Sequence, residues 1–320
     1  MFRESPREPT QAGVIRAAAK IREILPPTPL LPVEIRGVRC WVKAENLQPI
    51  GAFKIRGAWH RLSDLTADER RNGVVAVSSG NHAQGVAWAA RRLAMAATIV
   101  MPRDAPQVKL DATRAMGAEI VLYERPGEDR DAIANALCDA RSAVFAHAYA
   151  DPWVIEGQGT AGIEICSQLG RQPAAIVACC GGGGLAAGLA LACPDTRIYP
   201  VEPEGWDDVA RSLAAGEILP VGPDAPKTAC DALQTPVTAP VNFAVLHGRV
   251  EAGCSVSEAE VRAAQRFAFS TLKLVLEPGG AAALAACIAG KIPLDEDTVI
   301  MLTGGNTDAA SFASVIGSAD

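Results

Sequence analysis

The sequence predicts an α/β protein with two doubly wound units, each a mostly parallel sheet with helices on both faces. Short apolar runs alternate with helical patterns, and they do so in two blocks separated near residues 141–151. The runs are almost continuously apolar, as parallel strands buried on both faces are. Glycine-bearing turns follow several of these runs, at the edge where open α/β sheets bind their ligands.

The chain begins with elements that precede the alternation. A helix pattern covers residues 12–24 and ends at two consecutive prolines, which cannot continue a helix. Apolar and β-branched residues then predict strands at 31–35 and 38–44, joined by a tight turn. Periodic apolar residues predict a helix at 55–65.

The two alternating blocks follow in order. In the first block, strands are expected at 74–77, 97–101 and 119–123, and helices at 83–93, 108–116 and 131–140. In the second block, strands are expected at 176–180, 198–202 and 299–302, and helices at 185–191, 258–272 and 281–289. No repeat of fixed period and no low-complexity tract interrupts them.

The composition is that of a globular enzyme and argues against several other classes. The chain has 320 residues, which is enough for two domains, and a net charge of −6, which disfavours binding to nucleic acid. No apolar run approaches the roughly 20 residues of a membrane helix, and the charged N-terminus lacks the apolar core of a signal peptide. The nine cysteines are scattered, with no C-x-x-C pair, so we expect reduced thiols and a cytoplasmic protein.

Lys54 is the first candidate catalytic residue. It lies in the segment GAFKIRG at residues 51–57, beside an aromatic ring and just ahead of a predicted helix. A desolvated lysine amine has a lowered pKa and attacks carbonyl carbons, which is the chemistry of Schiff-base formation. The alternative is a surface lysine after a turn, and the rest of the chain favours the catalytic interpretation.

Four consecutive glycines at 181–184 follow a predicted strand and open a helix. Without Cβ atoms, their N–H groups can crowd around an anion at the positive end of the helix dipole, which predicts a phosphate site. The same stretch also fits G-x-G-x-x-A through Ala186, with Glu202 ending the next strand. That is the dinucleotide fingerprint, so a nicotinamide-dependent dehydrogenase stays open as an alternative of a different class.

Two more polar turns follow predicted strands. Residues 78–82, Ser-Ser-Gly-Asn-His, place hydroxyls, an amide and free N–H groups at a helix start, where they can bind a carboxylate. The alternative is an ordinary helix cap formed by Ser79 or Asn81. Thr303 begins a Thr-Gly-Gly-Asn turn after the last strand, and the alternative there is a simple glycine turn. One converging site explains these turns and Lys54 better than separate coincidences.

These segments, taken in order, resemble the signature of the fold-type II pyridoxal-phosphate enzymes, which share the fold of the tryptophan synthase β subunit. The similarity is to the serine/threonine dehydratase and serine racemase group and runs from about residue 29 to residue 308. The segments that carry it are 46–57, 78–85, 181–185, 277–281 and 303–306.

The resemblance implies an architecture as well as a cofactor. It implies a large cofactor-binding domain of residues 1–72 and 144–320 and a small domain of residues 73–143 that carries the substrate loop. It also implies a homodimer that acts on a small amino-acid substrate, while the charge and the short apolar runs exclude nucleic acid and membrane as expected partners. The cofactor that the resemblance implies is pyridoxal 5′-phosphate.

The resemblance also implies roles for individual residues. Lys54 would form the Schiff base and later move the α-proton, with Phe53 packed beside the cofactor ring. Asn81 would hydrogen-bond the 3′-hydroxyl of the cofactor, and Thr303 would face its pyridine nitrogen. The phosphate would be held by Gly181, Gly182, Gly183, Gly184 and Leu185. The substrate would be bound by Ser78, Ser79, Asn81, His82 and, for an acidic substrate, Arg130.

The implied reaction is elimination of the β-hydroxyl of serine, threonine or 3-hydroxyaspartate, which yields a 2-oxo acid and ammonia. A neutral hydroxyl such as Thr303 stabilises a charged pyridine ring less than a carboxylate does, and elimination needs less delocalisation of charge. Ser79 keeps a second reaction open, because racemases and hydroxyaspartate dehydratases carry serine where threonine deaminases usually carry alanine. A hydroxyl opposite Lys54 could protonate the α-carbon, so a serine or aspartate racemase is the alternative. A non-catalytic binding protein on the same scaffold is a further one.

Glu202, the carbonyl of Trp206 and Asp208 resemble the divalent-cation site of the same group. Two carboxylates and a carbonyl are hard oxygen ligands that suit Mg²⁺, Ca²⁺ or Mn²⁺. The alternative is a pair of solvated acids in a loop.

The chain departs from the family pattern at several positions. Ala232 stands where glycine is usual, Gly279 where serine or threonine is common, and Thr303 where serine is commoner. The extra methyl group of Ala232 is expected to narrow or reshape the substrate pocket. No regulatory domain is expected after Asn306.

Overall fold

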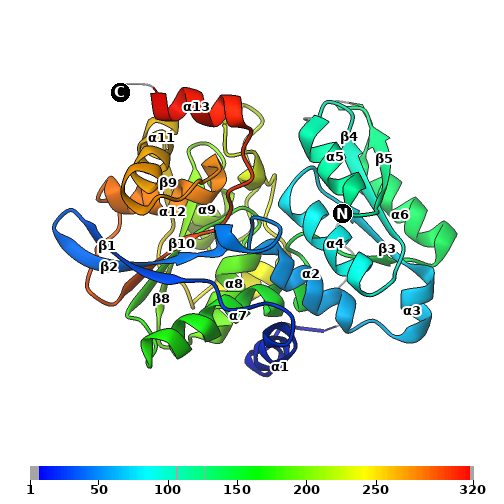
Figure 1. The fold of residues 1–320 in the computed structure, drawn as a ribbon, viewed down its shortest axis with the longest axis horizontal. Helices are drawn as coiled ribbons and strands as arrows, with labels where there is room; N and C mark the ends of the chain where they lie inside the picture. Colours follow the sequence, from blue (N-terminus) through cyan, green and yellow to red (C-terminus); the bar gives the residue numbers. More distant parts are fainter. Residues whose placement is uncertain (1–6, 106, 126, 318–320) are drawn as a thin grey trace.

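Two sheets covered by helices make up the computed structural model, which describes residues 7–105, 107–125 and 127–317 (Figure 1). The larger sheet has the strand order β1-β2-β10-β7-β8-β9, and all neighbours are parallel except the β1–β2 hairpin. Its strands are β1 (Leu30–Ile35), β2 (Val38–Ala44), β7 (Ala175–Cys179), β8 (Arg197–Pro203), β9 (Cys254–Val256) and β10 (Thr298–Leu302).

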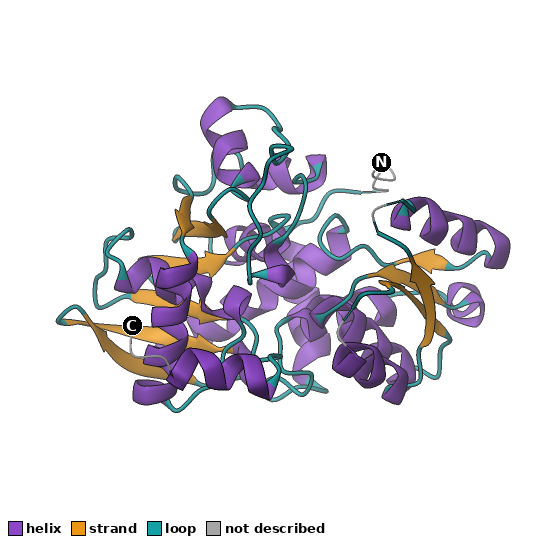
Figure 2. Cartoon of the chain, turned by 90° about the horizontal axis from the view of Figure 1, so that it is seen from above, coloured by secondary structure: helices purple, strands orange, loops and turns teal. Residues whose placement is uncertain are grey.

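The smaller sheet is entirely parallel and has the order β5-β4-β3-β6. Its strands are β3 (Val74–Val77), β4 (Ala97–Pro102), β5 (Glu119–Tyr123) and β6 (Val144–Phe145). Figures 1 and 2 show the two sheets at opposite ends of the molecule, each with its own helices. The predicted α/β fold class is therefore confirmed. The predicted domain limits remain a prediction, and β6, which pairs with β3, lies just beyond the limit at 143.

Thirteen α-helices surround the sheets in the described part of the chain, and their bounds place the elements of the site. They are α1 (Gln11–Arg22), α2 (Lys54–Ser63), α3 (Ala67–Asn72), α4 (Asn81–Arg92), α5 (Gln107–Ala115), α6 (Arg130–Arg141), α7 (Pro152–Leu169), α8 (Gly184–Ala192), α9 (Asp208–Ala215), α10 (Pro240–Leu246), α11 (Glu258–Phe267), α12 (Pro278–Ile288) and α13 (Ala309–Gly317). None of the described helices is long and apolar enough to span a membrane.

The central strand β7 shows how the larger sheet is buried on both faces. Ala175, Val177 and Cys179 pack into the core with α12, whereas Ile176 and Ala178 pack into the core with α7 and α8. Because both faces of the strand meet apolar helices, the sequence of β7 is a continuous apolar run rather than an alternating one.

The long helix α7 falls in a segment for which the sequence predicts no element. Its glycines disfavour helix by about 1 kcal/mol each relative to alanine, and most of its residues are buried, so it lacks a clear polar face. Tertiary contacts explain the glycines. A Cβ at Gly157 would lie 2.5 Å from the Cα of Gly57 in α2, and one at Gly159 would lie 2.4 Å from the carbonyl oxygen of Gly188 in α8. Three helices thus meet at backbone distance.

The other elements match their predictions within a few residues at each end, with a few additions. The helix expected at 258–272 is α-helical to Phe267 and then forms a π turn at Ala268–Leu272. No element is predicted from the sequence at the short helices α3, α9, α10 and α13 or at strands β6 and β9. These elements are too short for apolar periodicity to reveal them.

Candidate active site

A cavity of about 730 Å³ is lined by loops that follow strands of both sheets. It brings together nearly all the residues singled out in the sequence. The predicted site residues that line it are Phe53, Lys54, Ser78, Ser79, Asn81, His82, Arg130, Gly181, Gly182, Gly183, Gly184, Leu185 and Thr303. The three predicted metal ligands do not line it.

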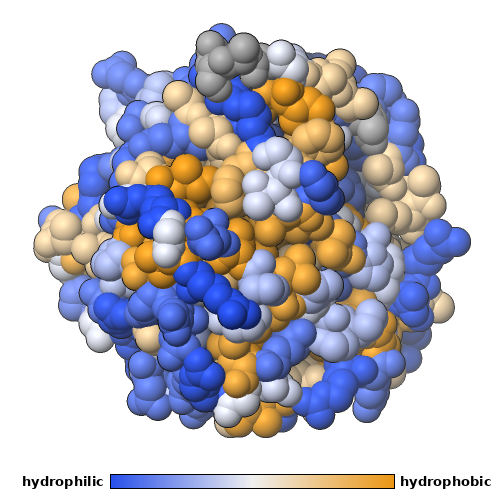
Figure 3. Space-filling view, turned by 60° about the vertical axis from the view of Figure 1, so that its left-hand side comes forward, coloured by the Kyte–Doolittle hydropathy of each residue, from blue (hydrophilic) through white to orange (hydrophobic). Residues whose placement is uncertain are grey.

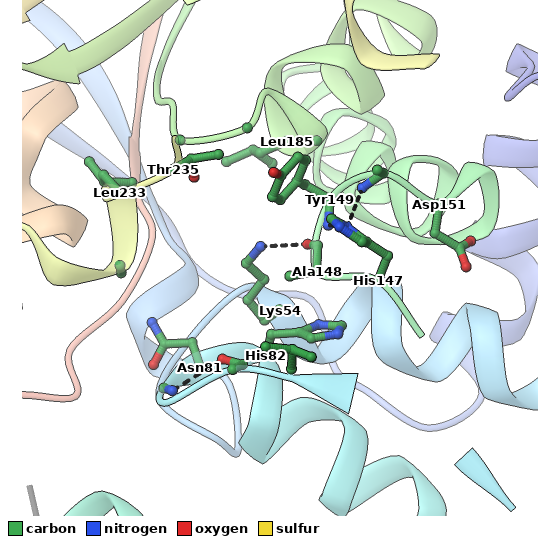
Figure 4. Close-up of a pocket in the computed structure, with 18 of the residues that line it drawn as sticks. Lys54, Asn81, His82, His147, Ala148, Tyr149, Asp151, Leu185, Leu233 and Thr235 are labelled. Carbon is green, nitrogen blue, oxygen red and sulfur yellow. Dashed lines mark hydrogen bonds between the residues drawn. The ribbon is translucent and has the colours of Figure 1, made fainter. Parts of the chain in front are cut away.

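Lys54 begins α2, and its side chain extends into the cavity (Figure 4). Its Nζ donates a hydrogen bond to the carbonyl oxygen of Ala148 at 2.8 Å and lies 5.2 Å from the ring centroid of Phe53. Burial lowers the pKa of Lys54 to about 8. More of the amine is therefore uncharged near neutral pH than in an ordinary lysine, as nucleophilic attack requires.

A buried ion network holds the helix that carries Lys54. The guanidinium of Arg56, near the start of α2, donates to both carboxylate oxygens of Glu45 at 2.7 Å. It also donates to both oxygens of Glu164 in α7, at 2.7 and 2.8 Å. Removing one member would leave a buried charge without its partner, which is strongly destabilising. The network therefore fixes where α2, and with it Lys54, begins.

The glycine loop at 181–184 is packed so closely that side chains do not fit. A Cβ at Gly182 would lie 2.2 Å from the ring of Tyr149, and one at Gly181 would lie 2.8 Å from Thr235 Oγ1. Gly183 has a φ of +88° and caps α8, which Gly184 begins. The free N–H groups at this helix start form a cradle suited to a phosphate. Figure 4 shows Tyr149 standing between Lys54 and Leu185.

The loop at 78–82 follows β3 and leads into α4. Its helix cap is Gly80, and no side chain makes a capping hydrogen bond, so the interpretation of Ser79 or Asn81 as a simple cap is wrong. Ser78 Oγ accepts a hydrogen bond from the N–H of Gly80 at 3.1 Å. His82 Nε2 is 2.9 Å from the carbonyl oxygen of Ala146, and burial lowers its pKa to about 3, so the ring is neutral.

Two neighbours fix the side-chain amide of Asn81. Its Nδ2 donates to Glu277 Oε1 at 2.5 Å, and its Oδ1 accepts from Asn306 Nδ2 at 2.8 Å. Asn306 also donates to the carbonyl oxygen of Ile50 at 2.8 Å. Burial raises the pKa of Glu277 to about 7. The amide is thus held in one orientation by two groups for which the sequence suggests no role.

Thr303 follows β10 and is held through its backbone and its side chain. Its N–H donates to the carbonyl oxygen of Gly280, and its own carbonyl oxygen accepts from the N–H of Phe53 at 3.1 Å. Its Oγ1 is 3.0 Å from the Sγ of Cys179, which ends β7. Burial raises the pKa of the Cys179 thiol to about 11, so the sulfur keeps its proton at neutral pH.

Three basic side chains besides Lys54 line the cavity, and they differ in their partners. Lys109 forms an ion pair with Asp231, and Arg61 forms one with Asp151. Arg130, at the start of α6, makes no ion pair with any described residue. Of these three, Arg130 is therefore the one that no described carboxylate holds in an ion pair, although Asp129 and Asp131 flank it in the chain.

The predicted metal ligands Glu202 and Asp208 lie together at the start of α9. Glu202 accepts hydrogen bonds from the N–H groups of Val209 and Ala210 at 3.0 and 2.8 Å. Asp208 Oδ2 accepts from the N–H of Thr238 at 2.7 Å, while its Oδ1 is buried with no hydrogen-bond partner. Burial raises the pKa of both carboxyls, that of Asp208 to about 7.

A cation would fit this pair, because it would satisfy the orphaned oxygen and favour two ionised carboxylates. The described residues contain no group of three His, Cys, Asp or Glu side chains that could hold a metal ion.

The position of Glu202 weakens the dinucleotide alternative. Its carboxylate is buried against α9 and does not line the cavity where a ribose would lie.

Two of the departures from the family pattern are neighbours. A Cβ at Gly279 would lie 3.2 Å from Leu233 Cγ and 3.5 Å from the Cβ of Ala232, and all three residues line the cavity. The methyl group of Ala232 thus lies next to the space that a side chain at position 279 would occupy.

Four side chains of the site are not singled out by the sequence: Tyr149, Glu277, Cys179 and Asn306. Glu277 and Asn306 lie inside segments that carry the resemblance, so their position was a usable signal. Tyr149 lies in the stretch between the two blocks, where the sequence predicts no element, and no sequence signal identifies it.

The chain is similar to known proteins along most of its length. A model of the family "Pyridoxal-phosphate dependent enzyme" matches residues 21–304. An L-threo-3-hydroxyaspartate ammonia-lyase of Pseudomonas sp is 40% identical over 312 residues, covering 95% of this chain and 97% of the relative. The serine racemase of Schizosaccharomyces pombe is 36% identical over 314 residues, covering 95% and 96%. Among solved structures, a threonine deaminase of T.th. aligns with a TM-score of 0.84 at 40% identity, covering 94% of this chain and 99% of that chain.

Proposed function

The chain belongs to the family of pyridoxal-phosphate dependent enzymes, and we propose that it is an ammonia-lyase that eliminates the β-hydroxyl of 3-hydroxyaspartate. It is a member of the serine/threonine dehydratase and serine racemase group, as the sequence predicts. The elimination releases one water, and hydrolysis of the resulting enamine takes one water up again and releases ammonia, which leaves a 2-oxo acid. The similarity to an L-threo-3-hydroxyaspartate ammonia-lyase supports the L-threo isomer as substrate.

The observation that carries the choice of substrate is Arg130, which lines the cavity and forms no ion pair with a described residue. Serine and threonine have one carboxylate, for which the loop at 78–82 offers hydroxyls and N–H groups. 3-Hydroxyaspartate has a second carboxylate, which needs a cation that no protein carboxylate already neutralises. A charge-assisted hydrogen bond from Arg130 would contribute about 1.5–3 kcal/mol to the binding of that group.

The residues of the cavity fit pyridoxal phosphate. The cradle at 181–184 has no room for side chains and offers N–H groups for the phosphate, together with Leu185. Phe53 offers a ring face, Asn81 an amide and Thr303 a hydroxyl for the ring of the cofactor. When bound, the cofactor supplies an electron sink that stabilises negative charge at the α-carbon of the substrate.

Lys54 would do the proton transfer. Its amine is kept partly uncharged by burial, so it can attack a carbonyl carbon and later accept the α-proton of the substrate. The hydrogen bond to Ala148 and the ion network around Arg56 hold it in one place before the substrate arrives. His82, neutral and bonded to Ala146, would shape the carboxylate loop rather than carry charge.

The test is a substrate panel with the matched variants Arg130→Met and Arg103→Met. The panel consists of L- and D-serine, L-threonine and the 3-hydroxyaspartate diastereomers, with oxo acid formation as the readout. We expect Arg130→Met to lower kcat/KM for 3-hydroxyaspartate by about 10- to 100-fold and to change that for serine little. Arg103, which pairs with Glu124 and does not line the cavity, serves as the control. An equal loss on both substrates would contradict the role of Arg130.

Racemisation is the second candidate because of Ser79. This residue lines the cavity and is not used as a helix cap, so its hydroxyl is available for chemistry. A proton donated to the α-carbon from that hydroxyl would invert the substrate. Serine or aspartate would then be converted to its enantiomer in a reaction that accompanies the elimination.

A divalent cation is the proposed partner of Glu202 and Asp208, with the carbonyl of Trp206 as a third ligand. The orphaned Asp208 Oδ1 and the raised pKa values of both carboxyls support it. Hard oxygen ligands suit Mg²⁺, Ca²⁺ or Mn²⁺. We expect a chelator to lower the thermal stability of the protein and any of these ions to restore it. A chelator without effect on the wild type would contradict the site.

A homodimer is the proposed assembly. Exposed large apolar side chains occur at Ile15, Leu47, Phe269 and Val275, and Phe269 packs against Phe312 with ring centroids 5.7 Å apart. Figure 3 shows apolar side chains gathered across the centre of one face of the molecule. Apolar side chains gathered on one face of a protein are typical of contact sites between subunits. Light scattering should give the mass of a dimer, and Phe269→Asp should shift it toward the monomer.

A reducing, cytoplasmic setting is the proposed location. Cys166 and Cys193 are not joined in a disulfide, although their sulfurs are 3.5 Å apart. Two thiols this close would be expected to join in an oxidising compartment. Fractionation of cells that make the protein tests the location.

A further inference from the structure

The thiol of Cys179 is a buried group in the cavity to which the proposed function gives no role. Cys179 ends β7 and Thr303 follows β10, and these strands are parallel neighbours. Their Sγ and Oγ1 atoms are 3.0 Å apart. Both residues line the cavity and are only 4% and 3% exposed.

We propose that Cys179 is a positioning residue: its thiol donates to Thr303 Oγ1, so that Thr303 directs its own hydrogen toward the pyridine nitrogen of the cofactor. The inference deepens the proposed function and rests on it. A hydroxyl has one hydrogen and two lone pairs, and a thiol has one hydrogen and a weak acceptor. If the thiol donates, Thr303 can donate to an unprotonated nitrogen. If Thr303 donates to sulfur, it offers only lone pairs, which suit a protonated nitrogen.

The surroundings favour the first arrangement. Oxygen is the better acceptor of the two atoms, and the sulfur keeps its proton because burial raises its pKa to about 11. Among the described residues, no charged side chain hydrogen-bonds to Thr303 or Cys179. Glu277, which also lines the cavity, bonds to Asn81 instead. Without an anion beside it, a protonated nitrogen is disfavoured in a buried site.

The arrangement has a consequence for the reaction. An unprotonated pyridine ring withdraws less charge from the α-carbon than a protonated one. Elimination tolerates this, because the negative charge that forms at the α-carbon is used at once to expel the β-hydroxyl. Inversion requires that charge to persist until the α-carbon is reprotonated. Cys179 therefore biases the site toward elimination.

The direct test is nitrogen NMR on the holoenzyme loaded with ¹⁵N-labelled pyridoxal phosphate. We expect the chemical shift of an unprotonated pyridine nitrogen in the wild type. Cofactor affinity is the second readout: Cys179→Ala should raise the Kd by about 2- to 12-fold, the worth of one hydrogen bond, and Cys179→Ser should restore it. Cys40→Ala, which removes an equally buried thiol from β2 outside the cavity, should leave the Kd unchanged.

The third readout needs neither cofactor nor substrate. The infrared S–H band of Cys179, isolated as the difference between wild type and Cys179→Ala, should rise in frequency in Thr303→Val, because the thiol loses its acceptor. A protonated nitrogen, or a band that Thr303→Val does not move, would overturn the inference and leave elimination, assayed separately, untouched. If the nitrogen is unprotonated and the band moves but no elimination occurs, the proposed function fails and the positioning stands. Cys179→Ser and Thr303→Val keep the test decisive if Cys179→Ala does not fold.

Discussion

The loops at 78–82 and 181–184 have the same place in their sheets but opposite surroundings. Each follows a buried parallel strand and leads into a helix that begins at the cavity. Every glycine of the second loop would bring a Cβ against protein, such as the ring of Tyr149 at 2.2 Å from position 182. Gly80, in the first loop, has nothing within 4 Å of the same position.

The glycine loop has a closely packed surface, whereas the loop at 78–82 is open beside Gly80. In the glycine loop, Tyr149, Thr235 and Leu246 already occupy the space that added side chains would need, so the loop offers its N–H groups to a ligand. A cofactor that stays needs the first kind of surface, and a substrate that enters and leaves needs the second. The following predictions test this division, starting with the largest effect.

Lys54→Ala should remove activity almost completely, because Lys54 would act on both the cofactor and the substrate that the two loops bind. We expect kcat to fall on the order of 10⁴-fold or more, as for the loss of a catalytic nucleophile and base. Treatment with borohydride should no longer attach the cofactor covalently to the protein, as judged by its absorption. Lys20→Ala, which removes an exposed partner of Asp64, is the control. Borohydride labelling that persists in Lys54→Ala would contradict the assignment.

Glu277→Gln should change how stability depends on pH, because Glu277 supports the open loop through Asn81. The pKa of Glu277 is raised from 4.5 to about 7, so its contribution to stability is complete below pH 4.5 and is lost as the pH rises through 7. Glutamine mimics the protonated acid and loses nothing. The variant should therefore gain on the wild type between these pH values, by on the order of 3 kcal/mol in the free energy of unfolding.

Chemical denaturation at a series of pH values measures this gain. Glu34→Gln, which removes an exposed carboxyl outside the cavity, is the matched control. A flat difference for Glu277→Gln would mean that Glu277 titrates normally in the folded protein.

Gly182→Ala and Gly80→Ala place the same methyl group in the two loops. At position 182 the methyl group meets Tyr149, and overpacking by about 1–3 kcal/mol should raise the Kd of the cofactor about 5- to 150-fold. At position 80 it meets nothing, so cofactor affinity should stay and only the KM of the substrate should change. Gly222→Ala, also in open space, controls for the substitution itself. Equal losses of cofactor affinity would remove the distinction between the loops.

Ser79→Ala should have the smallest effect on elimination and the clearest effect on inversion. The variant keeps Lys54 and the N–H groups of the loop, so oxo acid formation should change only a few-fold. Formation of the enantiomer, followed by chiral chromatography, should fall much further. An unchanged ratio of inversion to elimination would exclude Ser79 as the second acid.

The two loops also show why part of the site could be predicted. The glycine loop works through its backbone, and four glycines after an apolar run leave few other interpretations. A role for Asn81 was predicted, but the groups that orient it, Glu277 and Asn306, are distant in the chain. Sequence periodicity carries no information about such contacts, which only form when β10 and β3 end at the same cavity.

The same limit applies to the fold. Most strands of the two sheets were predictable because strands buried on both faces must be apolar throughout, whereas the short strands β6 and β9 were not. Helix α7 was not, because its glycines read as helix breakers until α2 and α8 are in place against them. Gly157 and Gly159 allow α7 to approach α2 and α8 at backbone distance, and they do not stabilise the helical conformation of α7 itself.

The sequence by itself determined the fold class, the family and most of the residues that gather at the cavity, because these depend on local patterns and on residue chemistry at fixed places. Only the tertiary structure decided which charges are free and which polar groups meet. It paired Lys109 and Arg61 with carboxylates but gave Arg130 no ion pair within the described part of the chain, and it brought a thiol against Thr303. Those facts depend on distances between elements far apart in the chain, which the order of residues does not record.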